Sequence, residues 1–442
     1  MQVKKTQEIT FESMLQCLNS AISCFPDKRT GENTKFSMNN VGMGAFSLFF
    51  TQNPSFLSFQ TIMQKKKGKN NAQSLFGISE IPSDNHIRNL LDIVDPSLLF
   101  PVFSNIFKSL TESGCMEQFR SFEGNLLCAL DGTQYFSSQK IHCKNCNHKK
   151  HKNGTITYFH TAITPVIVAP GKNKVISLEP EFITPQDGHT KQDCENAAAK
   201  RWISQYASIY KKNGLTILGD DLYCKHSICS LIIEQGLDFI LTCKPGSHKK
   251  LYQLIEESDK MHEIQEVVEK RWTGNDHEID TYRFSNNVPV RDGDDAIEVN
   301  WCELVTAQTD GTILYKNAFA TNFKISKSNV KLIVTDGRAR WKVENENNNV
   351  LKTKGYHLEH NFGHGDKHLS SIFLTFNLLS FLFHTVLDMM DEKYKLIRED
   401  LPTRETFFND LRALTRYMYF DSWDSMMTFM FNGLELSFPN TS

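Results

Sequence analysis

The stretch LTILGDDLYCKHS, residues 215–227, decides how the fold is read. It opens on a short, mostly apolar run that is typical of a buried strand. Two acids, Asp220 and Asp221, follow where that strand would end. Successive side chains of a strand point to opposite faces, so only one of the two can face a given neighbouring strand. Alternatively, the pair simply caps the helix that follows, because Asp favours N-cap positions.

Strand-like and helix-like segments alternate on both sides of this stretch. A helical pattern over residues 193–214 ends at Gly214, a residue that suits the C-cap. Strand-like runs lie upstream of that helix, and a helix and another strand follow residue 225. These segments are, in chain order, 125–130, 155–169, 174–180, 226–236 and 237–243. The order predicts an α/β domain built on one mixed sheet with flanking helices.

Periodicity divides the rest of the chain. Residues from about 246 to 330 contain strand-like runs separated by Gly- and Asp-rich turns, which predicts a β-rich insertion. Residues 1–120 and 392–442 read as helical regions. The mixed sheet and its insertion therefore belong to a domain spanning 121–391.

Composition and charge exclude several classes of protein. The chain has 442 residues, a formal charge of -2 and a pI near 6.7, so any positive field for nucleic acid must be local. Its eleven cysteines follow no disulfide framework, which favours reduced thiols in a cytoplasmic protein. The N-terminus has no apolar signal-peptide core. The apolar segment 370–390 contains Asn377, His384 and Asp388, so we expect a buried helix and no membrane contact.

Acids recur at the ends of the expected strands. Asp131 follows the first apolar run, as Asp220 or Asp221 follows the fourth, and acids from neighbouring strand ends of an open sheet can meet. By itself the Asp131-Gly132 pair also suits a hairpin turn.

A third acid lies in a polar stripe. Arg340, Glu344, Asn348 and Lys352 recur every four residues, which places a carboxylate between cations on one helix face. An ordinary exposed face with an ion pair is the alternative. Asp336 would be the N-cap of this helix.

Taken together, these segments resemble the DDE transposases of bacterial insertion sequences, which have an RNase H-like catalytic domain. The resemblance covers roughly residues 38–390 and implies that Asp131, Asp220 and Glu344 are catalytic. In that family the glutamate motif runs Tyr, two residues, Arg, three residues, Glu, six residues, Lys. Arg340 and Glu344 keep this spacing, whereas Gly337 occupies the tyrosine position and Lys352 comes one residue late.

The resemblance implies a reaction and its cofactors. Two Mg²⁺ ions can activate a hydroxyl nucleophile and stabilise the leaving oxygen of a phosphodiester, and both prefer carboxylate oxygens. Asp131 would bridge the two ions, with Asp220 and Glu344 on either side. Arg340 and Lys352 would orient DNA phosphate.

The expected partner is double-stranded DNA, namely the ends of the element and its target, bound by a homodimer as the resemblance implies. Lys65, Lys66, Lys67 and Arg88 of the N-terminal region are candidates for phosphate contacts, although a solvated loop at residues 63–71 is the alternative. Two other functions remain open: a DDE-type nuclease that no longer joins strands, and an inactive DNA-binding protein derived from a transposase.

A separate motif follows Asp131. Cys143 and Cys146 have the spacing of a zinc knuckle, which any of three histidines would complete. The three are His148, His151 and His160. A basic loop with free thiols is the alternative. His360, His364 and His368 also suggest a metal site, but Gly363 and Gly365 interrupt their helical spacing, so we expect no ligation there.

Overall fold

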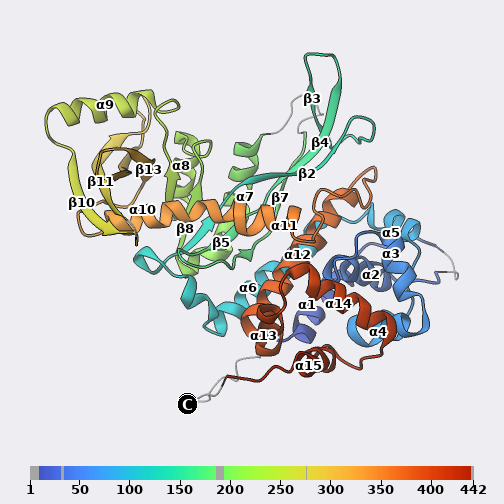
Figure 1. Ribbon diagram of the computed structural model, residues 1–442. Helices are drawn as coiled ribbons and strands as arrows, with labels where there is room; N and C mark the ends of the chain where they lie inside the picture. The colour runs from blue at the N-terminus through green and yellow to red at the C-terminus, as the bar shows by residue number, and fades with distance from the viewer. Residues whose placement is uncertain (1–8, 31–33, 186–193, 275, 440–442) are drawn as a thin grey trace, which may run out of the picture.

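The computed structural model describes residues 9–30, 34–185, 194–274 and 276–439 (Figure 1). A mixed sheet runs from a β-rich lobe at one end of the molecule to a body of helices at the other. The strands of the main sheet are β1 (Leu126–Ala129), β5 (Val166–Val168), β6 (Ile176–Ser177), β8 (Leu215–Gly219), β9 (Asp238–Thr242), β10 (Gln265–Trp272), β11 (His277–Pro289), β12 (Glu298–Gln308) and β13 (Ile313–Thr321). The predicted α/β class with a mixed sheet and flanking helices is confirmed.

The order of the main sheet is β10-β11-β12-β13-β9-β8-β1-β5-β6. At its centre β1, β8 and β9 run parallel to one another, whereas β5 and β6 are antiparallel additions beside β1. Of these, β1 and β8 are buried along their whole length, as expected where helices cover both faces.

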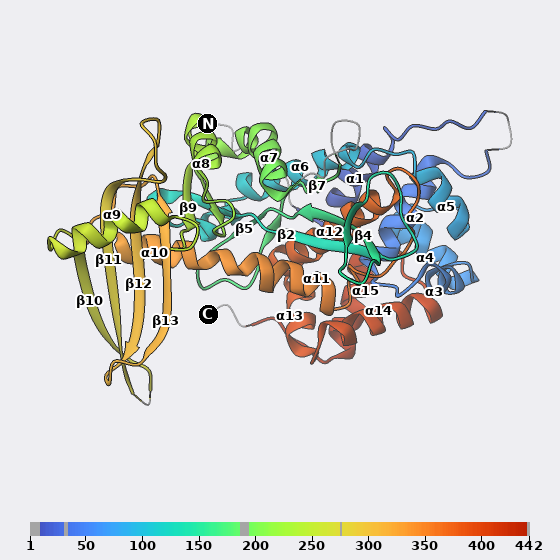
Figure 2. The same cartoon turned by 90° about the horizontal axis from the view of Figure 1, so that it is seen from above.

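The β-rich insertion extends the same sheet. After β9 the chain forms α9 (Lys249–Lys260) and then the long antiparallel strands β10 to β13, of which β13 returns to pair with β9. Figure 2 shows these strands as a tall lobe at one end of the molecule.

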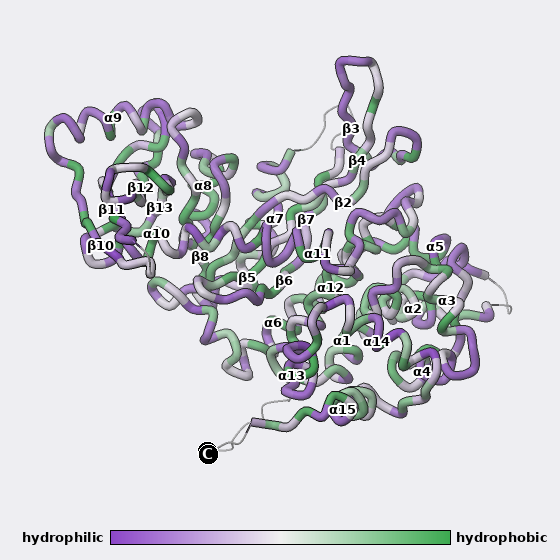
Figure 3. The backbone as a smooth tube through the Cα atoms, viewed as in Figure 1, coloured by the Kyte–Doolittle hydropathy of each residue, from purple (hydrophilic) through white to green (hydrophobic). Residues whose placement is uncertain are grey.

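A second, smaller sheet begins directly after β1 in the chain. It contains β2 (Gly132–Ser138), β3 (Asn147–Lys150), β4 (Ile156–Ile163) and β7 (Glu181–Ile183), with β4 pairing to each of the other three. The β3–β4 hairpin projects from the body, and its tip is hydrophilic in Figure 3.

Helices near both ends of the chain share one core. The N-terminal ones are α1 (Phe11–Ile22), α2 (Met38–Phe50), α3 (Phe56–Met63), α4 (Lys66–Phe76), α5 (Asp84–Leu91) and α6 (Phe100–Glu112). The C-terminal ones are α12 (Leu369–Met390), α13 (Glu392–Asp400), α14 (Arg404–Tyr417) and α15 (Trp423–Gly433). α12 packs on α2 and on β6, and α14 packs on α3 and α4.

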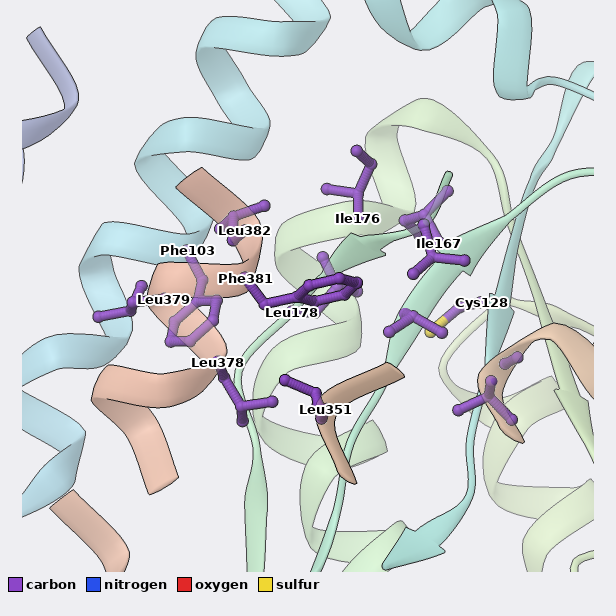
Figure 4. Packing of buried hydrophobic residues seen from close by; sticks show 14 of the residues in the cluster. Phe103, Cys128, Ile167, Ile176, Leu178, Leu351, Leu378, Leu379, Phe381 and Leu382 are labelled. Atoms are coloured by element: carbon purple, nitrogen blue, oxygen red, sulfur yellow. The ribbon is translucent and has the colours of Figure 1, made fainter. Parts of the chain in front are cut away.

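The interface between this body and the sheet is apolar. In Figure 4, side chains of α12 such as Leu378 and Phe381 lie close to Phe103 of α6 and Leu351 of α11 (Asn349–Thr353), with Ile176 of β6 nearby. All five are 3 % exposed or less. Burial of such side chains contributes roughly 1.5–3 kcal/mol each, so this contact fixes the helices on the sheet.

α12 behaves as the buried helix expected from the sequence. It is the one helix of the described chain that alone has the length and apolarity to cross a membrane, and 89 % of its apolar window is buried. The bent pair Asp84–Leu91 and Pro96–Glu112 passes the same test only when taken together. Two polar groups of α12 have partners within the protein: the Asn377 side-chain amide donates to the Tyr356 carbonyl at 2.8 Å, and Asp388 pairs with Lys174 at 2.9 Å.

Two local expectations are wrong. The lysine-rich residues 63–71 do not form a loop, because α4 begins at Lys66 and buries Ala72, Leu75 and Phe76. Asp336 is not an N-cap either. It lies inside α10 (Val330–Arg338), is 1 % exposed, and accepts hydrogen bonds from the Ser121 hydroxyl and the Phe122 amide.

Two helices connect the strands near a buried acid. α7 (Glu195–Tyr210) precedes β8, and α8 (His226–Glu234) precedes β9. Glu179, which follows β6, is 1 % exposed and accepts a hydrogen bond from the Tyr210 hydroxyl of α7. Burial raises the pKa of Glu179 to about 7, although the Tyr210 hydrogen bond opposes this shift.

This pKa predicts a pH dependence of stability. Between the ordinary pKa of 4.5 and about 7, the folded chain keeps a proton that the unfolded chain loses, so the stability from this group falls as pH rises through that window. Glu179→Gln keeps a hydrogen-bond partner for Tyr210 and cannot ionise. We expect it to raise the free energy of unfolding at pH 8 by roughly 1–3 kcal/mol and to change it little at pH 4.5. Parallel denaturant titrations at both pH values test this, and equal differences at the two would contradict it.

Candidate functional site

The parallel pairing of β1 with β8 brings the first two predicted acids together. Ala129 lies beside Leu218, and Leu130 continues the pairing by donating to the Leu218 carbonyl at 2.9 Å. The same register, continued past the strands, sets Asp131 beside Asp220. Sites in open α/β sheets form at this edge, beyond the carboxyl ends of parallel strands.

The side chains of Asp220 and Asp221 point in different directions, as the alternation of side chains along a strand requires. Asp220 accepts the Leu222 amide at 2.8 Å and lies close enough to Asp131 to raise its pKa. Asp221 accepts the Lys244 amide at 2.7 Å and the Ser247 hydroxyl, both in the segment after β9. It does not cap α8, whose N-cap residue is Lys225.

Glu344 reaches the same region from a long helical run. α10 continues through a 3-10 turn at Ala339–Trp341 and a π-helical segment at Val343–Asn348 into α11. The π segment is one wider turn, an irregularity frequent at functional sites. Glu344 forms an ion pair with Arg340 at 2.7 Å, and its side chain is 51 % exposed.

Asn348, a member of the polar stripe without an assigned role, contacts Asp131 directly. Its side-chain amide donates to Asp131 at 3.0 Å, and its carbonyl oxygen accepts from the Thr164 hydroxyl at 2.8 Å and from Asn347 at 3.0 Å. The Thr164 amide also donates to the Asp131 backbone carbonyl. This network fixes the orientation of the Asp131 carboxylate against the helix.

A fourth acid, Glu195, was not found by sequence reasoning. It is the first residue of α7 and accepts the Gly132 amide at 3.1 Å and the Tyr223 hydroxyl at 2.5 Å. In sequence it is an ordinary acid in the first turn of a helix, where the helix dipole favours it. Only the contact between the start of α7 and Gly132, the first residue of β2, reveals its position.

The acids act on Asp131 together. Burial raises the pKa of Asp131 to about 7, with further increases from Glu195, Glu344 and Asp220, and Arg340 opposes them. The region therefore holds four acids, whose charges are opposed by one nearby cation, Arg340.

The acidic group is open. Among the described residues, two Cys/His groups have three or more candidate ligand atoms within 4.8 Å of one another, and the acids around Asp131 are not such a group. A Mg²⁺ ion keeps several waters and needs only one or two direct carboxylates, so its chemistry fits an open set of oxygen donors.

The predicted cations lie in different places. Arg340 faces the acids, whereas Lys352 pairs with Glu359 at 3.0 Å. Lys65, Lys66 and Lys67 are exposed at the start of α4, which lies across the helical body from β8 in Figures 1 and 2. Arg88 lies over the ring of Phe56 and 3.6 Å from Asp84. The N-terminal cations are thus not brought to the acids.

The second feature is a buried group of two cysteines and two histidines. Cys143 and Cys146 lie between β2 and β3, His160 lies on β4, and His364 precedes α12. Of the three histidines considered from the sequence, His160 completes the knuckle, whereas His148 and His151 lie outside it. The expectation for His364 is wrong, because it supplies the fourth candidate ligand.

The distances match a tetrahedral zinc site. The Cys143 and Cys146 sulfurs are 3.9 Å apart, and the two histidine Nε2 atoms are 3.1 Å apart. Sulfur-to-nitrogen distances are between 3.3 and 3.7 Å. Around zinc, with Zn–S of about 2.3 Å and Zn–N of about 2.0 Å, ligand atoms lie roughly 3.3–3.8 Å apart.

The surroundings of the group suit metal ligands. His364 uses its other ring nitrogen, Nδ1, toward the Gly365 carbonyl at 2.8 Å, which leaves Nε2 facing the cysteines. Hydrogen bonds from Cys146, and also from His160 and His364, lower the pKa of the Cys143 thiol against the effect of burial. A thiolate is the form that binds a metal. The group could therefore hold a metal ion.

No family model matches this chain, and no curated protein matches it.

The structure accounts for Gly337, which occupies the tyrosine position of the transposase motif. Here α10 crosses the sheet so closely that a Cβ atom would lie 2.7 Å from the ring of Phe319 and 2.9 Å from Ile240. These residues belong to β13 and β9. A tyrosine would have no space at this position.

We expect Gly337→Ala to destabilise the fold. Overpacking in a close contact costs about 1–3 kcal/mol, and the higher helix propensity of alanine recovers about 1 kcal/mol of this. The matched control is Gly433→Ala at the end of α15, where nothing lies within 4 Å. Thermal unfolding should show a lower Tm for the first variant only. A Tm for Gly337→Ala equal to or above that of Gly433→Ala would disprove the close contact.

Proposed function

We propose that the protein is a DNA transposase of the DDE type, which cleaves and joins strands at the ends of its own element by metal-dependent phosphoryl transfer. The observation that carries the proposal is the convergence of Asp131, Asp220 and Glu344, from two strand ends and one helix, on a single acidic region. These are the three acids that the sequence resemblance selects.

The topology supports the same proposal. Strands β6, β5 and β1 are antiparallel in turn, and β8 and β9 follow β1 in parallel, which agrees with an RNase H-like sheet. The β-rich insertion lies between β9 and the helical run that carries Glu344. Such an insertion lengthens the chain without moving the acids relative to the central strands.

The residues fit a hard divalent cation. Carboxylate oxygens are the donors that Mg²⁺ prefers, and the acids around Asp131 have an uncompensated negative charge. Two bound Mg²⁺ ions would activate the attacking oxygen and stabilise the leaving oxygen of the phosphodiester. Asp131, Asp220 and Glu344 would hold them.

The remaining residues position these groups. Asn348 orients Asp131, and Tyr223 together with the Gly132 amide holds Glu195 behind it. Arg340, beside Glu344, is placed to bind a phosphate of the DNA strand through its planar guanidinium. Lys352 would contribute only after leaving its ion pair with Glu359.

Other cations would hold the DNA away from the acids. Because the net charge is -2, phosphate binding must come from local groups. We assign this role to the exposed Lys65, Lys66 and Lys67, to Arg88, and to Lys149 and Lys150 on the projecting hairpin. A homodimer in the cytoplasm, acting on paired element ends, completes the proposal.

Zinc at Cys143, Cys146, His160 and His364 would be structural. Four protein ligands leave no position for a substrate, which distinguishes structural from catalytic zinc sites. The ion would fasten the β2–β3 loop and β4 to the segment before α12. A hydrogen bond from Asn145 to the Lys367 carbonyl at 2.8 Å joins the same two segments.

The experiment compares two adjacent aspartates. The substrate is DNA cloned from both sides of the gene, incubated with the full chain and Mg²⁺ or Mn²⁺. We expect the parent to join a 3′-hydroxyl end to target DNA and Asp220→Asn to abolish joining. Asp221→Asn should lower the rate of strand joining by no more than about 10- to 100-fold, which is the usual effect of replacing a group that acts through its neighbours.

Each other outcome selects a different function. A parent that cuts the ends but never joins them would indicate a DDE-type nuclease. A parent that binds the ends and cuts nothing with either metal would indicate a transposase-derived DNA-binding protein. Equal activity in Asp220→Asn and Asp221→Asn would refute the assignment of Asp220.

A further inference from the structure

A second group of buried metal-binding side chains lies at the ends of β8 and β9. Cys224 ends the turn that follows Asp220, Cys243 comes directly after β9, and His248 is the N-cap residue of α9. One candidate ligand atom from each lies within 4.8 Å of the other two. All three residues are 5 % exposed or less.

His248 gives an independent sign of a missing ligand. Its Nε2 atom is buried without a hydrogen-bond partner, and the side chain is 3 % exposed. The nearest carboxylate oxygen, on Asp221, is 3.5 Å away and is already used by the Lys244 amide. A buried polar atom without a partner is costly, so this ring is set for a ligand that the protein does not supply.

The cysteines are arranged as a pair facing the same point. The Cys224 thiol contacts the side chains of Cys229, Cys243 and His248, of which Cys243 and His248 supply the other candidate ligand atoms. All eleven cysteines are free in the structure, so the two sulfurs are not consumed in a disulfide. Two sulfurs and an imidazole are a soft donor set that selects zinc over Mg²⁺.

We propose that Cys224, Cys243 and His248 bind a zinc ion, separate from the Cys143 group and from the carboxylates. The Asp221 carboxylate lies at the edge of the site, 3.5 Å from the His248 Nε2 atom, and is held mainly by the segment after β9. A water molecule completes four-fold coordination.

The site would clamp the two loops that follow the central parallel strands. Cys224 is four residues after Asp220 and follows Tyr223, which holds Glu195. Fixing Cys224 to the segment after β9 therefore holds the turn that carries Asp220. This consequence for Asp220 rests on the proposed function, whereas zinc binding itself does not.

Zinc stoichiometry tests the proposal without reference to activity. The full chain is purified under reducing conditions with zinc, dialysed, and analysed for bound metal by mass spectrometry. We expect two zinc ions per parent chain, one for each Cys/His group. Cys224→Ala with Cys243→Ala should remove one, and Cys143→Ala with Cys146→Ala should remove the other.

A matched control separates ligand loss from general damage. Cys302 is fully buried on β12 and belongs to neither group, so Cys302→Ala should keep both ions. Because the paired alanines at 224 and 243 can unfold the chain, crystals of the parent are also examined by anomalous scattering at the zinc edge. A zinc peak between Cys224, Cys243 and His248 is expected.

Two results would overturn this proposal. One is a parent chain with a single zinc that disappears only when Cys143 and Cys146 are replaced. The other is a Cys224–Cys243 disulfide in the freshly reduced and dialysed protein. Neither result bears on the carboxylates, whose role is tested by strand joining.

Discussion

The parallel hydrogen-bonded register between β1 and β8 is the constraint on which the rest of the site depends. These strands are far apart in sequence, and their pairing sets Asp131 beside Asp220. The same edge receives α7 with Glu195, and the loops after β8 and β9 with both aspartates and the second Cys/His group. A slip of one residue would turn every side chain of a strand to the other face and would separate the acids.

The helical run from Val330 to Thr353 supplies the second constraint. Gly337 allows it to approach the sheet, and the π segment that follows carries both Glu344 and Asn348. Close packing at one point therefore determines which residues further along the helix reach Asp131. The absence of a larger side chain at position 337 has a physical cause in this packing.

Sequence patterns predicted those features of the fold that depend only on residues close together in the chain. The apolar run at 215–219 is a strand of those bounds, and the β-rich insertion has the expected strands. The site was predictable where an acid ends a strand. The sequence did not predict Glu195 and His364 as site residues. Their roles come from contacts across 63 and 218 residues of chain, for which no local spacing exists. The lysine-rich segment was misread because its buried face begins only at Gly68, after Lys65, Lys66 and Lys67.

The central claim is that Asp131, Asp220 and Glu344 form one divalent metal site. Anomalous X-ray scattering from crystals soaked in Mn²⁺, a substitute for Mg²⁺ at oxygen sites, tests it most directly. The account predicts Mn²⁺ peaks in contact with the Asp131 carboxylate and reaching Asp220 or Glu344. Well-ordered Mn²⁺ bound only elsewhere, with the Asp131 carboxylate still held by Asn348 and free of metal, would contradict it.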